Sequence, residues 1–250
     1  MSDLKITDLK NTLIPGSTWS TTNKLKGYEK NEGNELATEL IIGRKFEIIE
    51  NPILDSLDLN QSRLRVQLLE DGYQCWLQIQ HIFNQIESSK GWKPKKFTRS
   101  QIYEKLPKII NWIEKSSKLS NHYVWGGTAG PNFDCSGLVQ RAFSIESIWL
   151  PRDAYQQEKF CTPINFNQND LKELIPGDLL FFGTSKKCSH VAVYRGNAEY
   201  WHSSGIENGR DGIGIDTLKP TNNNDISSYY LSILRGAGRV EYCHDGSFIA

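Results

Sequence analysis

Short apolar stretches separated by polar turns dominate the chain between about residues 25 and 83. Two of them, "ELIIGRKFEIIE" and "RLRVQLLEDGYQCWLQI", have the length of short β-strands. In the second stretch, apolar and aromatic residues flank "EDG", a turn signal that predicts a β-hairpin. The strands are few and short, and helical periodicity is weak, so the pattern favours a small β-barrel over an open sheet.

The composition of the chain changes after the predicted barrel. The stretch "NQIESSKGWKPKKFTRS", residues 84–100, is polar, basic and interrupted by proline, which is typical of a connection between domains. We place the linker itself at residues 89–98. This predicts a barrel domain with an N-terminal extension at residues 1–88 and a second domain at residues 99–250.

Helical spacing begins after the linker. Apolar residues recur at the interval of one helix face at Ile102, Leu106, Ile109, Ile110 and Ile113. The spacing predicts a helix with Ser100 as a possible N-cap and with a kink or a restart at Pro107. A second apolar stripe predicts another helix over about residues 135–147, with its N-terminus at or beside Cys135.

Strand-like runs occupy the last part of the chain. The stretches "GDLLFFG", "HVAVYRG", "AEYWHSS" and "YLSILRGAGRV" are apolar, β-rich and bounded by glycine, which predicts an antiparallel sheet. Helices come first and strands after them, so the second domain is expected to be α+β, with helices packed on the antiparallel sheet.

Composition narrows the possible partners and the compartment. Lysine plus arginine equals aspartate plus glutamate, at 29 each, so no overall field favours nucleic acid or a membrane surface. The N-terminal stretch has no apolar core of a signal peptide, and no apolar run approaches the ~18 residues of a membrane span. The five cysteines are irregularly spaced and do not form a disulfide framework. Together these features predict a cytoplasmic protein.

Cys135 in "NFDCSGLV" is the first candidate for chemistry. At a helix N-terminus, unpaired backbone N–H groups and the helix dipole stabilise a thiolate and can receive an oxyanion. The adjacent Asp134 disfavours the thiolate, which makes this pairing unusual for a reactive cysteine. Asp134 can instead act as the N-cap of the helix, and a cysteine among apolar residues can simply belong to the core.

Two histidines lie on consecutive predicted strands. His190 begins "HVAVY", His202 lies in "YWHSS", and "RGN" between them is a plausible tight turn. Such a hairpin would let His190 act as the base for Cys135 while His202 accepts the other ring N–H of His190. The alternatives are two histidines with local hydrogen bonds, or a zinc site that adds Cys188 to Cys135 and the two histidines. Only "CSH" has the short spacing of a structural zinc site.

The ordered motifs "YVWGG", "FDCSGLV", "PGDLLFF", "HVAVY" and "WHSSG" match a family. Over residues 120–205 the chain resembles the NlpC-type papain-like cysteine peptidases of bacterial cell-wall peptides. The stretches "YVWGGTAGPNFDCSGLVQRAF" and "IWLPRDAYQQE" are similar to the cyanobacterial and Bacillus-type members with N-terminal SH3-like domains. The resemblance implies an SH3-like barrel followed by a papain-like α+β domain. It also implies γ-D-glutamyl-L-diamino acid endopeptidase activity without a cofactor.

The resemblance assigns catalytic roles residue by residue. It implies Cys135 as the nucleophile, His190 as the general base and acid, and His202 as the polar third member of the triad. It also implies that Tyr123 lies beside the oxyanion site.

The same resemblance assigns the substrate pocket. It implies that Asp134, Ser136 and Asp153 line the pocket, and that Tyr73 of the barrel hairpin reaches toward it. One position departs from the family pattern: Ala154 follows the aspartate where some members have serine, so a hydrogen bond from that position is in doubt.

The expected function is hydrolysis of the bond between γ-D-glutamate and the diamino acid in murein peptides with a free N-terminal L-alanine, as part of peptide recycling. Asp134, Tyr73 and Asp153 would bind the substrate ammonium. The expected partner is the murein peptide, with no nucleic acid and no membrane. Two alternatives remain: a non-catalytic wall-peptide-binding protein that acts through its barrel, or an amidase or acyltransferase on the same scaffold.

Overall fold

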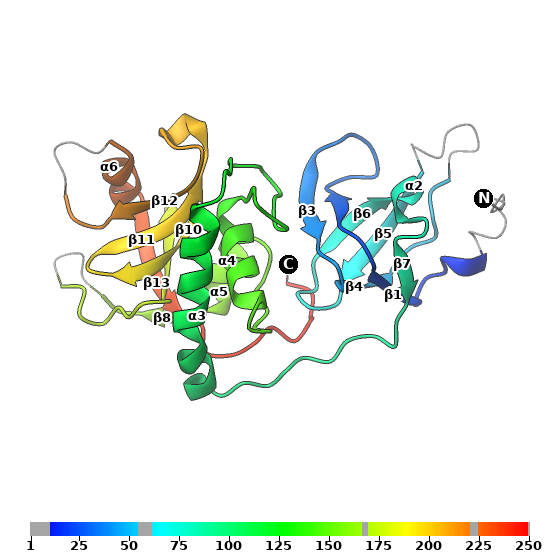
Figure 1. The fold of residues 1–250 in the computed structure, drawn as a ribbon, viewed down its shortest axis with the longest axis horizontal. Helices are drawn as coiled ribbons and strands as arrows, with labels where there is room; N and C mark the ends of the chain where they lie inside the picture. Colours follow the sequence, from blue (N-terminus) through cyan, green and yellow to red (C-terminus); the bar gives the residue numbers. More distant parts are fainter. Residues whose placement is uncertain (1–10, 55–61, 167–169, 221–224, 250) are drawn as a thin grey trace. The chain divides into compact units, whose positions relative to one another are not determined.

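The computed structural model describes residues 11–54, 62–166, 170–220 and 225–249, and it divides into two compact units (Figure 1). The first unit contains the residues up to Pro94 together with those from Asp245 onward, and the second is Lys95–His244. No helix or strand lies between Ser88 and Arg99. The predicted limits, 1–88 and 99–250, differ from this division because they assign the C-terminal residues to the second domain, and they stay predictions.

The first unit is a sheet of short antiparallel strands. Its elements are β1 (Thr18–Thr21), β2 (Leu25–Tyr28), β3 (Leu36–Leu40), β4 (Lys45–Ile48), β5 (Arg63–Leu68), β6 (Gln74–Gln78), the one-turn helix α2 (Ile79–Ile82) and β7 (Ile86–Ser88). The strand order is β3-β2-β6-β5-β4-β1-β7. The predicted hairpin is confirmed, since β5 and β6 pair on either side of "EDG". The strands extend beyond the predicted range of 25–83, because β1 precedes it and β7 follows it.

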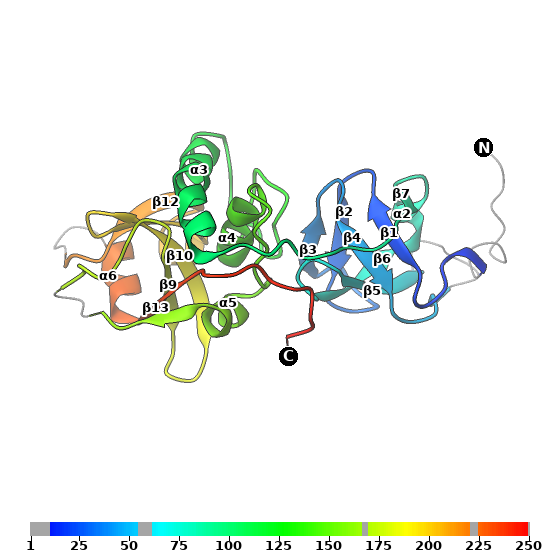
Figure 2. The same cartoon turned by 90° about the horizontal axis from the view of Figure 1, so that it is seen from below.

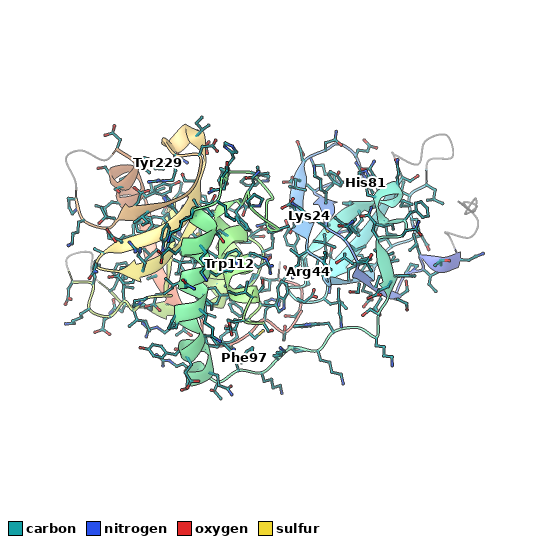
Figure 3. All side chains as sticks on the ribbon, viewed as in Figure 1. Lys24, Arg44, His81, Phe97, Trp112 and Tyr229 are labelled. Atoms are coloured by element: carbon teal, nitrogen blue, oxygen red, sulfur yellow. The ribbon has the colours of Figure 1, made fainter. Side chains whose placement is uncertain are left out.

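The β5–β6 turn is held by buried charges and by the C-terminal residues. Arg44 (Figure 3) forms ion pairs with Glu70 at 3.4 Å and with Asp71 at 2.5 Å, and all three side chains are buried. A Cβ atom on Gly72 would lie 2.1 Å from the carbonyl oxygen of Ser247. Glycine is therefore required at the turn, because the C-terminal backbone passes directly against it.

Three helices of the second unit precede its antiparallel strands, which confirms the α+β prediction. They are α3 (Arg99–Ser117), α4 (Cys135–Ser144) and α5 (Ala154–Phe160), and a further helix, described below, precedes the last strand. The strands are β8 (Thr162–Ile164), β9 (Leu179–Gly183), β10 (Cys188–Gly196), β11 (Glu199–Ser204), β12 (Gly212–Thr217) and β13 (Leu234–Arg239). They pair antiparallel in the order β12-β11-β10-β9-β13-β8.

The last predicted strand is partly wrong. The first residues of "YLSILRGAGRV" belong to the helix α6 (Asp225–Ser232), and β13 begins only at Leu234. The helix turns Tyr230 inward, where its side chain is 2% exposed, while Tyr229 remains half exposed (Figure 3). An isolated aromatic pair does not distinguish a helix from a strand by periodicity, which explains the error.

The start of α3 also differs from the prediction. The N-cap is Thr98 rather than Ser100: the Thr98 side chain accepts from the Gln101 N–H at 3.3 Å, and Gln101 Oε1 accepts from the Thr98 N–H at 2.9 Å. This reciprocal capping box satisfies two donors of the first turn. Pro107 lies inside the helix without ending it. The proline is exposed, so water can reach the carbonyl that loses its N–H partner.

Both faces of the second sheet are covered (Figures 1 and 2). Alternate strand residues such as Phe181 and Val191 join a core with α3, α4 and α5. The residues between them, such as Phe182 and Ala192, join a second core that includes Tyr230 of α6. In the described part of the chain, no helix combines the length and the apolar character needed to cross a bilayer.

Candidate active site

Cys135 is the first residue of α4, as the sequence predicted. Asp134 has extended backbone angles and is the N-cap: its Oδ1 accepts from the Gly137 N–H at 2.6 Å. A Cβ atom on Gly137 would lie 2.1 Å from the carbonyl oxygen of Gly127. Glycine at this position therefore lets the loop that contains "WGG" pack against the first turn of the helix. The cap interpretation of Asp134 is confirmed.

The carboxylate of Asp134 accepts several hydrogen bonds besides the one that caps the helix. The buried Arg152 makes a two-pronged ion pair with it, with Nη2 at 2.6 Å from Oδ2 and Nη1 at 3.2 Å from Oδ1. The Gly126 N–H donates to Oδ2 at 2.9 Å, and the Ser136 hydroxyl donates to Oδ1 at 3.2 Å. With the cap, five donors meet about four lone-pair sites. Arg152 thus compensates the charge that stands beside Cys135.

The surroundings of Cys135 favour the protonated thiol over the thiolate. Burial, followed by the charge of Asp134, raises the pKa of Cys135 to about 12. The backbone N–H groups of Val191 and Ser136 and the charge of Arg152 lower the pKa, but by less. The helix N-terminus alone therefore does not produce a thiolate, so a neighbouring base has to remove the proton.

A β-hairpin brings together the two histidines that were predicted to act as the base and its partner. The strands β10 and β11 meet at a tight turn in which Asn197 and Ala198 both have positive φ. His190 Nε2 lies 2.9 Å from His202 Nδ1, and both rings are buried. Val191, the residue after His190, directs its backbone N–H to Cys135. The structure therefore brings Cys135, His190 and His202 into one region of the second unit.

Both imidazoles are neutral at neutral pH. Burial, with a smaller effect of His202, lowers the pKa of His190 well below its ordinary value. Burial also lowers the pKa of His202, although the hydrogen bond and the charge of Asp216 oppose the shift. A neutral imidazole has a free lone pair, which a general base requires.

The predicted pocket residues are distributed as follows. Tyr123 is half-buried, and its pKa is raised by burial and then by electrostatic interaction with Cys135 and Asp134. The Ser136 hydroxyl accepts from Arg152 Nη1 at 3.0 Å. Asp153 is the N-cap of α5, and Ala154 is the first residue of that helix. Tyr73 lies before β6 in the other unit, so its role stays a prediction.

Three residues near the site were missed in the sequence. Arg152 follows "LP", where nothing in the spacing reveals an ion pair 18 positions away. Asp216 lies on β12, and its Oδ2 is 2.7 Å from His202 Nε2. Tyr230 of α6 places its ring 4.5 Å from the His190 ring and donates to or accepts from the Ser204 hydroxyl at 2.6 Å. The pattern "GIGID", with a charged residue ending an apolar alternation, was the available signal for Asp216.

The zinc alternative has no support in the described part of the chain, where no group of three or more histidine, cysteine, aspartate or glutamate side chains has a geometry that could hold a metal ion. Cys188 donates to the His190 carbonyl at 3.3 Å rather than joining the two imidazoles. All five cysteines are free thiols.

Two family descriptions match this chain. The NlpC/P60 family matches residues 120–235, and the bacterial dipeptidyl-peptidase SH3 domain matches residues 28–82. The chain carries an NlpC/P60 domain after a bacterial SH3 domain. The NlpC/P60 match spans Cys135, His190 and His202, which the structure brings together.

Two curated relatives each match more than two thirds of the chain. A bifunctional muramidase/DL-endopeptidase CwlT of Bacillus subtilis is 33% identical over 185 residues, which are 71% of this chain and 49% of that protein. A gamma-D-glutamyl-L-lysine dipeptidyl-peptidase of Bacillus cereus is 33% identical over 178 residues, 70% of this chain and 48% of that protein. The chain thus spans about half the length of these relatives. A crystal structure of an NlpC/P60 family protein from Bacillus cereus is 21% identical, with a TM-score of 0.45, and the match covers 93% of this chain and 66% of that one.

The Asp134–Arg152 pair gives a stability prediction. Replacing Arg152 with methionine keeps most of the side-chain volume but leaves a buried carboxylate uncompensated, which should lower the free energy of unfolding by about 3–5 kcal/mol. Urea denaturation followed by circular dichroism measures the change. The matched control is Lys118→Met, which removes a solvent-exposed ion pair with Glu114 on α3; little change is expected there. An equal loss in both variants would contradict the proposed weight of the buried pair.

Proposed function

We propose that the chain is a cysteine peptidase that hydrolyses the γ-D-glutamyl–diamino acid bond of murein peptides with a free N-terminal L-alanine. The observation that carries the proposal is the buried His190–His202 pair, with the Val191 N–H directed at a thiol on the N-terminus of α4. The family match and the peptidase names of the curated relatives support the same chemistry.

Acylation begins from the neutral pair of thiol and imidazole. His190 takes the Cys135 proton as the sulfur attacks the γ-carbonyl carbon of the D-glutamate, and negative charge develops on the carbonyl oxygen. We assign the stabilisation of that oxyanion to the backbone N–H groups at the start of α4 that Asp134 does not occupy, together with the Tyr123 hydroxyl. The C–N bond then breaks, and the imidazolium of His190 gives its proton to the leaving amine of the diamino acid.

Deacylation uses the same residues in reverse order. His190, neutral again, takes a proton from water as the water oxygen attacks the thioester carbon. The C–S bond breaks, the proton returns to the sulfur, and the dipeptide leaves with a new γ-carboxylate. No cofactor is needed for either step.

A free amine on the substrate is the feature that would confine the enzyme to recycling. In intact murein, the L-alanine amine is bound to a sugar and carries no charge, so a pocket that requires an ammonium selects peptides already released from glycan. Ser136 and Asp153 are the residues we assign to this pocket beside Asp134. An approaching ammonium would have to share Asp134 with the five donors that already contact it.

The substrate prediction is tested with L-Ala-γ-D-Glu-L-Lys and with its diaminopimelate counterpart, each free and N-acetylated. Mass spectrometry of the products should show released L-Ala-γ-D-Glu, and acetylation should lower kcat/KM by roughly tenfold to a hundredfold, the size of a charge-assisted hydrogen bond in a water-poor pocket. Cleavage between sugar and peptide in murein fragments would instead indicate an amidase, and binding without turnover would indicate a wall-peptide-binding protein.

The residue that meets the ammonium is identified by a double-substitution cycle. Asp153→Asn keeps an N-cap of equal quality on α5 while it removes the charge, so the fold is preserved. If Asp153 contacts the amine, the penalties of acetylation and of this variant are less than multiplicative. The same cycle with Asp134→Asn tests whether Asp134 acts on substrate or only within the domain, and multiplicative penalties would remove either residue from the pocket.

A further inference from the structure

A third strand extends the row of polar side chains that begins at Cys135. His202 Nε2 lies 2.7 Å from Asp216 Oδ2, on the ring edge opposite the nitrogen that meets His190. β11 and β12 pair in register, with His202 opposite Gly214, so Asp216 lies two residues further along the neighbouring strand. His202 is 0% exposed and Asp216 is 2% exposed. The contact is thus sealed from water.

The surroundings of Asp216 favour its ionised form at neutral pH. Arg210 Nη2 donates to Asp216 Oδ2 at 2.7 Å, and the Ser227 hydroxyl of α6 donates to Oδ1 at 2.8 Å. Burial raises the pKa of Asp216, but the hydrogen bonds from His202 and Ser227 and the charge of Arg210 outweigh it and hold the pKa at about 2. Two strands and one helix therefore converge on a single carboxylate.

An ionised carboxylate fixes the protons of both rings. It can only accept hydrogen bonds, so His202 Nε2 must carry a proton. A neutral His202 then has its lone pair on Nδ1, which lies 2.9 Å from His190 Nε2, so His190 must donate from Nε2. The lone pair of neutral His190 is therefore on Nδ1, the nitrogen that is not used by His202.

We propose that Asp216 is a positioning residue that orders the protons of His202 and His190 and stabilises the positive charge formed when His190 takes the proton of Cys135. The proposal rests on the assignment of Cys135 and His190 as nucleophile and base. It adds a fourth member to the triad, one that touches neither substrate nor thiol and acts through His202. A wrongly ordered pair of rings would present an N–H to the thiol, and the base would be lost.

The proton order is measured on the unmodified protein. Histidine ring nitrogens have distinct 15N shifts when protonated and when bare, so correlation spectra of 15N-labelled protein report the tautomer of each ring. His190 and His202, identified from spectra of His190→Ala and His202→Asn, should both be protonated on Nε2 and bare on Nδ1 at neutral pH. A bare Nε2 on either ring would overturn the proposal, and this result does not depend on any Asp216 variant being folded.

The charge effect is measured in Asp216→Asn by the rate at which iodoacetamide alkylates Cys135, followed by mass spectrometry across pH. Loss of the carboxylate disfavours the imidazolium, so the pKa of the histidine pair falls. The acidic inflection should move to lower pH, and the plateau rate should fall by about tenfold for each unit of pKa lost. We call the hydrogen-bonded chain Asp216–His202–His190 the relay. Other titratable groups around it include Arg210, Tyr200 and Tyr230. Burial raises the pKa values of both tyrosines, so they stay neutral across the pH range of the alkylation measurement.

Two comparisons separate positioning from mere stability. Asp178→Asn removes another buried aspartate, whose carboxylate accepts hydrogen bonds from Arg239 at 2.8 Å and from the Ile175 N–H at 2.8 Å. This variant should lower stability without moving the inflection. Adding Asp216→Asn to His202→Asn should change the alkylation rate little, because without His202 the carboxylate of Asp216 no longer reaches His190. An inflection that stays in place in Asp216→Asn, or a full further loss in the double variant, would overturn the proposal.

These measurements are independent of the proposed substrate. If the wild-type protein shows the expected tautomers and the shifted inflection but cleaves no murein peptide, the relay stands and the proposed function fails. If it cleaves the peptide while the tautomers differ, the proposed function stands and the relay fails.

Discussion

Cys135→Ala is expected to abolish hydrolysis of L-Ala-γ-D-Glu-L-Lys. Without sulfur there is no thioester, and the remaining groups can only orient water and stabilise an oxyanion. The step that is lost divides one difficult reaction into two easier ones. In an enzyme whose active residues work as a unit, loss of the nucleophile costs on the order of 10⁶ in kcat. Turnover should therefore fall below detection in a product assay by mass spectrometry.

The fold should survive this replacement, because only the sulfur atom is removed and Asp134 still caps α4. The matched control is Cys161→Ala, which changes another buried cysteine, at the C-cap of α5. Burial raises the pKa of Cys161 too, but no histidine contact is described for it. Full activity in Cys161→Ala and none in Cys135→Ala is the expected result. Undiminished activity of Cys135→Ala would remove the peptidase mechanism.

Sequence patterns predicted the parts of the fold that depend on local rules. The "EDG" hairpin, the turn near "RGN" and the helix that begins at Cys135 all follow from periodicity and turn chemistry, and all are present. The helix α6 was missed because its only buried aromatic residue, Tyr230, has a partner in the sheet rather than a repeat in its own sequence. Tertiary contact, not local pattern, fixes that element.

The candidate site divides in the same way. Cys135, His190 and His202 were predicted from motifs and strand spacing, and their proximity is now described. Arg152 and Asp216 could not be placed, because an ion pair or a relay between distant segments leaves no period in the sequence. The sequence alone also could not explain why Asp134 stands beside Cys135, because the arginine that compensates the charge of Asp134 is 18 positions away.

His190 and His202 should contribute unequally, and the difference reports their roles. A general base typically contributes about 10²–10⁴ in rate, so His190→Ala should lower kcat/KM by at least a hundredfold. His202→Asn should retain more activity, because the amide oxygen of asparagine can still accept the N–H of His190. His81→Ala, on α2 of the first unit (Figure 3), is the control and should leave kcat/KM unchanged.

Measuring the alkylation of Cys135 in the two histidine variants, besides hydrolysis, tests which histidine deprotonates the thiol. In His190→Ala, Cys135 keeps its buried environment and its raised pKa, about 12, but has no base, so iodoacetamide should react slowly at neutral pH and faster as the pH rises. In His202→Asn, the base is present but is cut off from Asp216, so alkylation should be slower than in the wild type and its acidic inflection should move to lower pH, as in Asp216→Asn. If His190→Ala is alkylated as fast as the wild type at neutral pH, another group deprotonates Cys135, and the pairing inferred from the Val191 N–H contact is wrong.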